Sequence, residues 1–236
     1  ISKLQNDPNS NFSQLKKEGV LFSTTISSAN ATILSWSSLF TSKFPFKTGI
    51  RSTRFNKLDS KIITSFDILK NNEYSIFGYL PKLSETVGLF PKFENPDYLY
   101  DFYGGLTNGL AEKTIEKINS KLSTPWFFLV HAMDLHQPIT ISKNFDNQDY
   151  GDTPYDRKLS EIDHYVGKII QEIDMENTIL VITSDHGDYI KSVKTSNTEL
   201  NFDQNAKNEM LISKFSKSIP TFLNPLKDKI FLKLEE

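Results

Sequence analysis

Two side chains that could bind a metal ion follow an apolar segment late in the chain. The stretch TILVITSDHGDYI, residues 178–190, passes from apolar residues directly into Asp185 and His186. A carboxylate beside an imidazole suits zinc or manganese better than an all-oxygen calcium site. The same tetrapeptide also fits a polar turn, in which Asp185 caps the next segment and Gly187 takes a positive φ. Short motifs often arise by chance, so taken alone this one favours the turn.

Two side chains upstream could take part in the same chemistry. His136 lies in DLHQP, after an apolar segment and before a proline, where an imidazole can carry a proton or bind an anion. Thr32 follows a Ser/Thr/Asn-rich turn and precedes a helix, where N–H groups and a bound metal could make its hydroxyl a nucleophile toward phosphorus or sulfur. The alternatives are a surface-turn histidine and an N-cap threonine, and the local sequence around Thr32 favours the cap. His131 and His164 are predicted to be structural.

The composition limits the class of protein. With 236 residues, 38% of them hydrophobic, the chain can build one large core, and we expect a single domain over 1–236. Its core is expected at about 11–190, followed by a polar loop and a short C-terminal segment over 191–236. The mixed charges, 27 basic against 29 acidic, leave no footprint for nucleic acid.

Features that the sequence lacks exclude some types of catalytic site and limit the expected location. There is no cysteine, so a nucleophile must be a hydroxyl or a carboxylate. No apolar run approaches the roughly 20 residues of a transmembrane segment. The chain as given is therefore expected to be soluble, with the cytoplasm favoured slightly over other locations, and its oligomeric state is left open.

Apolar periodicity predicts alternating helices and strands. The predicted helices cover residues 12–19, 34–41, 62–69, 111–122 and 155–173, and the predicted strands cover 20–26, 74–80, 127–130 and 178–183. Residues 91–105 and 191–205 are predicted as loops. This order is typical of an α/β fold with a mostly parallel sheet sandwiched by helices. Ligand groups in such folds gather beyond the carboxyl ends of the strands, where His136 and the Asp185-His186 pair lie.

Four segments carry motifs in a characteristic order. They are FSQLKKEGVLFSTTISSANATILSWSSLFTSKFPFKTGI, ITSFDILKNNEYSIFGYL, WFFLVHAMDLHQP and YDRKLSEIDHYVGKIIQEIDMENTILVITSDHGDY. They include a nucleophile block, an H-x-P motif, a D-x-x-V-G helix and an S-D-H-G strand end. Over most of residues 11–190, this set resembles the sulfatase-like branch of the alkaline phosphatase superfamily. The resemblance implies an alkaline-phosphatase-like α/β fold.

The resemblance also implies roles for individual residues. Asp185 and His186 match one pair of metal ligands, Thr32 matches the nucleophile, which also contacts the metal, and His136 matches the histidine that faces the substrate's anionic group or leaving oxygen. The implied reaction is in-line displacement at phosphorus or sulfur by an ionised Thr32, with water or an alcohol as the acceptor. The implied cofactor is a divalent metal ion, zinc or manganese in preference to calcium or magnesium.

The resemblance further implies a substrate class, a phosphate or sulfate ester of a small molecule, a glycan or a lipid. Sulfatases proper use a formylglycine made from cysteine or serine, and oxidation of threonine cannot produce that aldehyde. Thr32 therefore favours a phosphoesterase or phosphotransferase over a true sulfatase.

Several positions depart from the family's pattern. Leu34 replaces its proline and Trp36 its arginine or histidine, which weakens anion binding and suggests an alternative, a catalytically degenerate binding or scaffold protein. The family's first strand, which ends in a ligand Asp, has no counterpart in ISKLQNDPNS. We therefore expect an N-terminally incomplete sequence that lacks this strand, which leaves open whether the chain alone is active. Lys191 and Lys194 are candidates for the family's late His or Lys.

Overall fold

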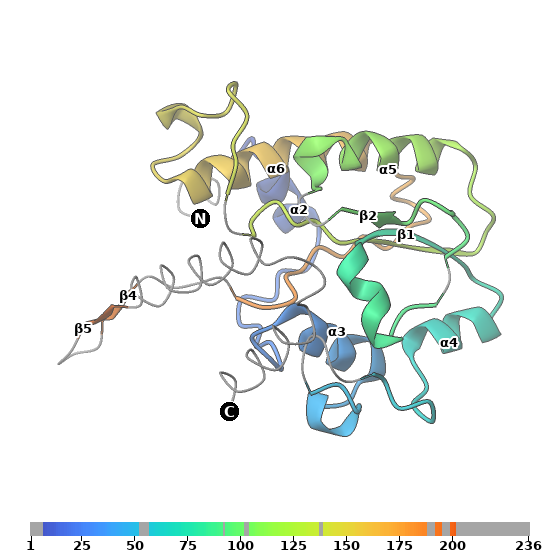
Figure 1. Ribbon diagram of the computed structural model, residues 1–236. Coiled ribbons are helices and arrows are strands. Elements are labelled where there is room, and N and C mark those ends of the chain that lie inside the picture. Colours follow the sequence, from blue (N-terminus) through green and yellow to red (C-terminus); the bar gives the residue numbers. More distant parts are fainter. Residues whose placement is uncertain are drawn as a thin grey trace, which may run out of the picture. The chain divides into compact units, whose positions relative to one another are not determined.

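The computed structural model describes residues 7–51, 57–91, 93–101, 104–136, 139–187, 192–194 and 199–201 (Figure 1). The chain divides into two compact units, Ile1–His186 and Gly187–Glu236. In the second unit, β4 (Ser192–Lys194) pairs antiparallel with β5 (Glu199–Asn201), with Val193 opposite Leu200. The loop predicted over 191–205 is wrong at these positions, because strands of three residues are too short to show an alternating pattern. The single-domain organisation over 1–236 stays a prediction.

A small parallel sheet forms the centre of the first unit. β1 (Ser75–Pro81) pairs with β3 (Trp126–Val130) in a register that runs from Ser75 opposite Trp126 to Tyr79 opposite Val130. β2 (Leu99–Tyr100) pairs with the carboxyl end of β1, and the strand order in the sheet is β2-β1-β3. β2 lies within residues 91–105, which were predicted as a loop. The strands predicted at 74–80 and 127–130 and the parallel α/β fold are confirmed.

Helices cover both faces of this sheet. Figure 1 shows α5 and α6 on one face and α3 and α4 on the other. The α-helices are α2 (Asn11–Glu18), α3 (Thr32–Thr41), α4 (Ser65–Asn71), α5 (Leu110–Asn119) and α6 (Pro154–Gln171). Short 3-10 turns are η1 (Pro45–Lys47), η2 (Lys82–Val87), η3 (Leu106–Asn108) and η4 (Gln148–Tyr150). All five predicted helices are confirmed.

Local capping explains where two of the helices begin. Thr64 accepts from the Asp67 N–H while the Asp67 carboxylate accepts from the Thr64 N–H, so α4 begins at Ser65 rather than at residue 62. Thr153 and Asp156 form the same capping box at the start of α6. In each case a hydroxyl and a carboxylate satisfy N–H groups that a helix leaves without internal partners.

The core on the α3/α4 side is rich in aromatic rings. It is built from buried residues of α3, α4 and β1, of the segment after η1, and of η2 with the segment that follows it: Ile33, Trp36, Phe40, Ile50, Phe66, Ile76, Leu80, Val87, Leu89 and Phe93. A smaller cluster of Leu106, Ala111 and Ile162 joins α5 and α6 on the opposite face. The amphipathic helices predicted from the sequence thus bury their apolar stripes on the sheet.

Two predicted strands are wrong in the described structure. Residues 20–26 and 178–183 form no strand, and their apolar side chains are exposed, with Phe22 at 79% and Ile179 at 92%. A strand exists only when a neighbour accepts and donates its backbone hydrogen bonds, and neither segment has one within the described residues. The expected additional strand of the family's sheet stays a prediction.

The contrast between the core and these exposed segments can be measured. Phe66 is 1% exposed, and we expect Phe66→Ala to lower the free energy of unfolding by about 3–5 kcal/mol through the cavity it leaves. Ile179→Ala removes a side chain that is already in water, so we expect a change of about 0.5 kcal/mol or less. Urea denaturation of both variants checks this, and equal losses would contradict the burial seen here.

Candidate active site

Thr32 is the first residue of α3, and its hydroxyl is directed at His186. The N-cap is Ala31, whose backbone is extended (φ −141°, ψ 140°), and no side chain caps this helix. Thr32 is therefore not the N-cap threonine that the local sequence favoured. Its Oγ1 instead lies 3.2 Å from His186 Nε2, across 154 residues of sequence. The hydroxyl stands at a helix N-terminus, where N–H groups of the first turn point outward.

The contacts of Asp185 agree only in part with the polar turn predicted for this tetrapeptide. Its Oδ1 accepts from the His186 N–H at 3.0 Å, as a local turn requires. Its Oδ2 is buried without a hydrogen-bond partner in the described part of the chain, and lies 3.5 Å from His186 Nε2. Gly187 does not take a positive φ. A buried carboxylate oxygen without a donor is costly unless something else binds it.

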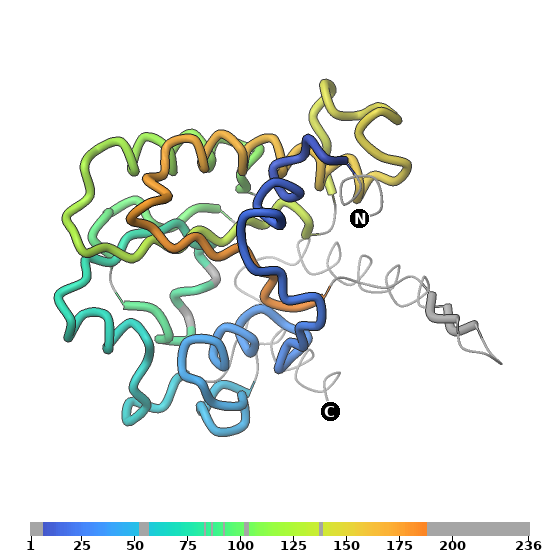
Figure 2. Tube along the Cα trace, turned by 180° about the vertical axis from the view of Figure 1, so that it is seen from behind, coloured from blue at the N-terminus to red at the C-terminus, as the bar shows by residue number. Residues whose placement is uncertain are grey.

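Serine hydroxyls tie the turn before α3 to the Asp185-His186 segment. Ser27 Oγ donates to the Asp185 carbonyl at 2.7 Å and lies 2.9 Å from Ser35 Oγ, which donates to the Ala29 carbonyl at 2.9 Å. Figure 2 shows the orange segment around residue 185 beside the blue stretch that leads into α3. Neither Ser27 nor Ser35 was among the site residues predicted from the sequence. Ser35 could have been noticed, since it follows Thr32 by about one helical turn.

His131 lies among the candidate residues although it was predicted to be structural. Its ring meets the Trp36 ring edge-on at 4.4 Å between centroids, and its Nε2 is 3.1 Å from Met133 Sδ. Burial lowers the pKa of His131 to about 4, opposed by the Asp185 charge and reinforced by His186 and His136. The residue directly follows β3, so the strand-end rule that selected His136 could have found it too.

His136 is held in a turn beyond β3. Its N–H donates to the Met133 carbonyl at 3.0 Å. Asp185, His186 and His136 all affect the pKa of His131, so these side chains lie near the His131 imidazole. The structure thus gathers Thr32, Asp185 and His186 by direct contacts and His136 by proximity to His131.

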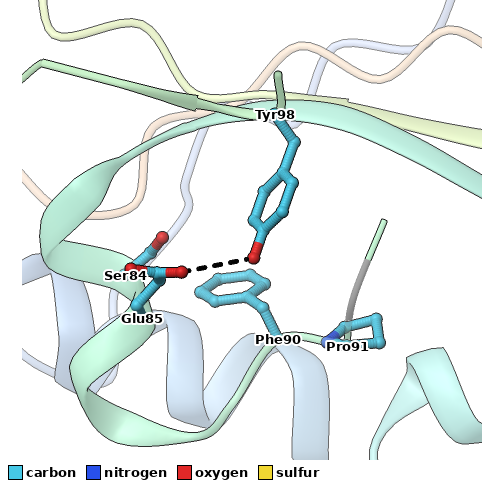
Figure 3. A pocket seen from close by; sticks show the side chains of 5 residues that line it. All are labelled: Ser84, Glu85, Phe90, Pro91 and Tyr98. Atoms are coloured by element: carbon cyan, nitrogen blue, oxygen red, sulfur yellow. Dashed lines mark hydrogen bonds between the residues drawn. The ribbon is translucent and has the colours of Figure 1, made fainter. Parts of the chain in front are cut away.

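A separate pocket of about 390 Å³ lies beside η2 (Figure 3). It is lined by Ser84, Glu85, Phe90, Pro91 and Tyr98, and the Tyr98 hydroxyl donates to Glu85 Oε1 at 3.5 Å. Burial and the Glu85 charge raise the pKa of the Tyr98 phenol. The pocket shares no residue with the Thr32–His186 contact, so it does not form part of the candidate site.

A family model described as Sulfatase matches residues 2–221. The chain belongs to the Sulfatase family. No curated protein matches the sequence. Membership confirms the resemblance to the alkaline phosphatase superfamily and supports a hydrolase or transferase of the sulfatase type, a family that generally uses a divalent metal and acts on sulfate esters. In the described residues, no helix of this sulfatase-family chain is long and apolar enough to span a membrane.

The candidate residues fit part of such a metal site. Asp185 offers a buried, unpartnered oxygen, and His186 and Thr32 offer a nitrogen and a hydroxyl beside it. Among the described residues, no group of three or more His, Cys, Asp or Glu side chains is placed to hold an ion. Of the two lysines predicted as late candidates, Lys191 lies outside the described residues and Lys194 is in β4. The donor types fit a divalent cation, and the described part of the chain supplies some of the ligands such an ion needs.

The depressed pKa of His131 predicts a pH dependence of stability. The unfolded chain binds a proton near the ordinary pKa of 6.5, whereas the folded chain resists protonation down to about 4. Protonation therefore favours the unfolded state, and stability falls as the pH drops from 6.5 to 4. We expect His131→Phe to lose less stability than the wild type across this window, measured by thermal melting with a chelator present. Parallel pH profiles would contradict this expectation.

Proposed function

We propose that the protein is a metal-dependent hydrolase or transferase that acts on phosphate esters, or less readily on sulfate esters, with Thr32 as its nucleophile. The observation that carries the proposal is the 3.2 Å contact between Thr32 Oγ1 and His186 Nε2 at the N-terminus of α3. A threonine whose only role was to begin a helix would not need to contact a histidine 154 residues later in the sequence. The nearby unpartnered oxygen of Asp185 supports the same assignment.

Asp185, His186 and the Thr32 hydroxyl are the residues that would hold a divalent cation, zinc or manganese by donor type. Such an ion, when bound, favours the ionised form of a hydroxyl and neutralises charge on the group being transferred. The chain's own contribution is positional. The serine contacts of Ser27 hold Asp185 against the turn before α3, and the helix N-terminus presents N–H groups to an anionic oxygen.

The remaining steps fall to the side chains around Thr32. Thr32 Oγ1 attacks phosphorus or sulfur, the ester oxygen leaves, and water or an alcohol then takes the group from Thr32. His136 binds the anionic group or gives a proton to the leaving oxygen. His131, neutral above pH 4, adds no positive charge and packs behind the site on Trp36.

The threonine favours phosphorus over sulfur. Its β-carbon carries a methyl group, so oxidation would give a ketone and never the aldehyde that sulfate-ester hydrolysis uses in this family. A direct hydroxyl nucleophile suits phosphate monoesters and diesters, including those of glycans or lipids.

Loss of nitrophenol release in two variants tests this proposal. We expect the full-length protein with zinc or manganese to cleave a nitrophenyl phosphate monoester or diester. Thr32→Ala and Asp185→Asn should each lower the rate by about a thousandfold or more, because nucleophile and ligand act as one unit. Initial rates followed by absorbance check this.

Two exposed positions serve as matched controls for these variants. Thr25→Ala removes an exposed hydroxyl from the same segment as Thr32, and Asp149→Asn removes an exposed carboxylate. Both should retain wild-type rates. Unchanged rates in Thr32→Ala and Asp185→Asn would reject the assignment.

Metal binding supplies a test that does not depend on turnover. We expect calorimetry to show binding of zinc or manganese by the full-length protein. His186→Ala should weaken it by about tenfold to a hundredfold, since one donor is lost. His164→Ala, on the outer part of α6, is the matched histidine control and should bind as the wild type does. No heat of binding in the wild type would sink the metal assignment.

A second candidate function rests on Trp36. This residue replaces the family's cationic side chain and is buried at 3% exposure, edge-on to Phe90 and His131, so it offers no charge to an anion. A catalytically degenerate protein that binds an ester without cleaving it would show this pattern. Saturable binding of a phosphate ester without turnover by the metal-loaded protein would favour this candidate over the enzyme.

A further inference from the structure

Three buried charged side chains lie behind the turn that carries His136. Asp134, which follows β3, is 1% exposed, and Lys158 and Glu161 of α6 are 3% and 1% exposed. Lys158 Nζ is 3.5 Å from Asp134 Oδ1 and 3.1 Å from Glu161 Oε2. Charges this deeply buried are costly unless each is paired and hydrogen-bonded, so the group must be satisfied as a whole.

Asp134 meets this requirement through the start of η3. Its Oδ2 accepts from the Leu106 N–H at 2.7 Å, and its Oδ1 accepts from the Thr107 N–H at 3.1 Å and the Thr107 hydroxyl at 2.8 Å. Lys158 also donates to the Thr107 hydroxyl. Gly105 makes room, since a Cβ there would stand 2.3 Å from Asp134 Oδ2. A residue with a side chain at position 105 would therefore displace the Asp134 carboxylate.

The same cluster holds the chain on both sides of His136. Asp134 precedes His136 by two residues, and the Ser142 N–H beyond it points to Glu161 Oε2 at 3.5 Å. Lys158 joins the two carboxylates, so both approaches to His136 are tied to one point on α6. Figure 1 shows α6 alongside α5 on this face of the sheet. The turn that presents His136 is therefore supported by a helix that contributes nothing else to the site.

We propose that Asp134, Lys158 and Glu161 form a positioning clamp that holds His136 in place at the candidate active site. The clamp rests on the proposed function only in that His136 acts on the substrate. A catalytic imidazole must be held to within a fraction of an ångström by its supporting residues. Removal of the clamp loosens His136 while Thr32, Asp185 and His186 keep their own contacts.

Variants of the full-length protein separate positioning from stability. Asp134→Asn should lower kcat by about tenfold to a hundredfold through a misplaced His136. KM should change by less than about threefold. The His136 imidazole cross peak in ¹H–¹³C spectra, assigned through His136→Gln, should shift or broaden. Lys158→Met alone leaves the two buried carboxylates without a cation. The triple variant Asp134→Asn/Lys158→Met/Glu161→Gln removes all three charges together, so it should regain melting temperature relative to Lys158→Met without regaining kcat or the wild-type cross peak.

Asp163→Asn is the matched control. Asp163 is a buried carboxylate on the same helix, but it binds the N–H groups of Asn11 and Phe12 instead. This variant should lower the melting temperature while kcat and the His136 cross peak stay as in the wild type. A cross peak unmoved in Asp134→Asn, or kcat restored with stability in the triple variant, would overturn the clamp. If the wild type cleaves no ester, the proposed function fails, and the cross peak still decides the clamp.

Discussion

The buried charges of α6 hold α2, η3 and the segment that follows β3 against this helix. Asp163 accepts from the Asn11 N–H at 3.0 Å and the Phe12 N–H at 2.8 Å, which fixes the start of α2 on α6. Gly167 allows this approach, because a Cβ there would stand 2.5 Å from the Asn11 side chain. The D-x-x-V-G motif is thus a docking site for a neighbouring helix. A buried carboxylate without these donors would destabilise the fold, so the arrangement follows from the need to pair it.

The candidate site is assembled from segments that are far apart in the sequence. α3 supplies Thr32, the end of β3 supplies His131 and the turn with His136, and the end of the first unit supplies Asp185 and His186. Hydrogen bonds of Ser27 and Thr32 join the first segment to the last. The parallel pairing of β1 with β3 then determines at which end of the sheet these residues meet.

Trp36 shows how packing changes the chemistry available at this site. The aromatic ring fills space between Phe90 and His131, where the family's pattern has a cation. Burial of His131 in this setting keeps its imidazole neutral at physiological pH. Under the proposed function, a bound metal would then supply most of the positive charge that an anionic substrate needs.

The sequence by itself determined the elements whose signals are local. Apolar periodicity identified the helices, and runs of apolar residues identified β1 and β3, because these patterns reflect which faces must be buried. The ordered motifs indicated the family and the candidate site residues. Periodicity was misleading for 20–26 and 178–183, which have strand-like sequences but no described neighbour to pair with.

Only the tertiary structure decided that Thr32 meets His186, that His131 belongs among the site residues, and that Asp134 is bound to η3 and α6. The physical reason is that hydrogen bonds and buried charges between distant segments depend on how the elements pack, which no local pattern records.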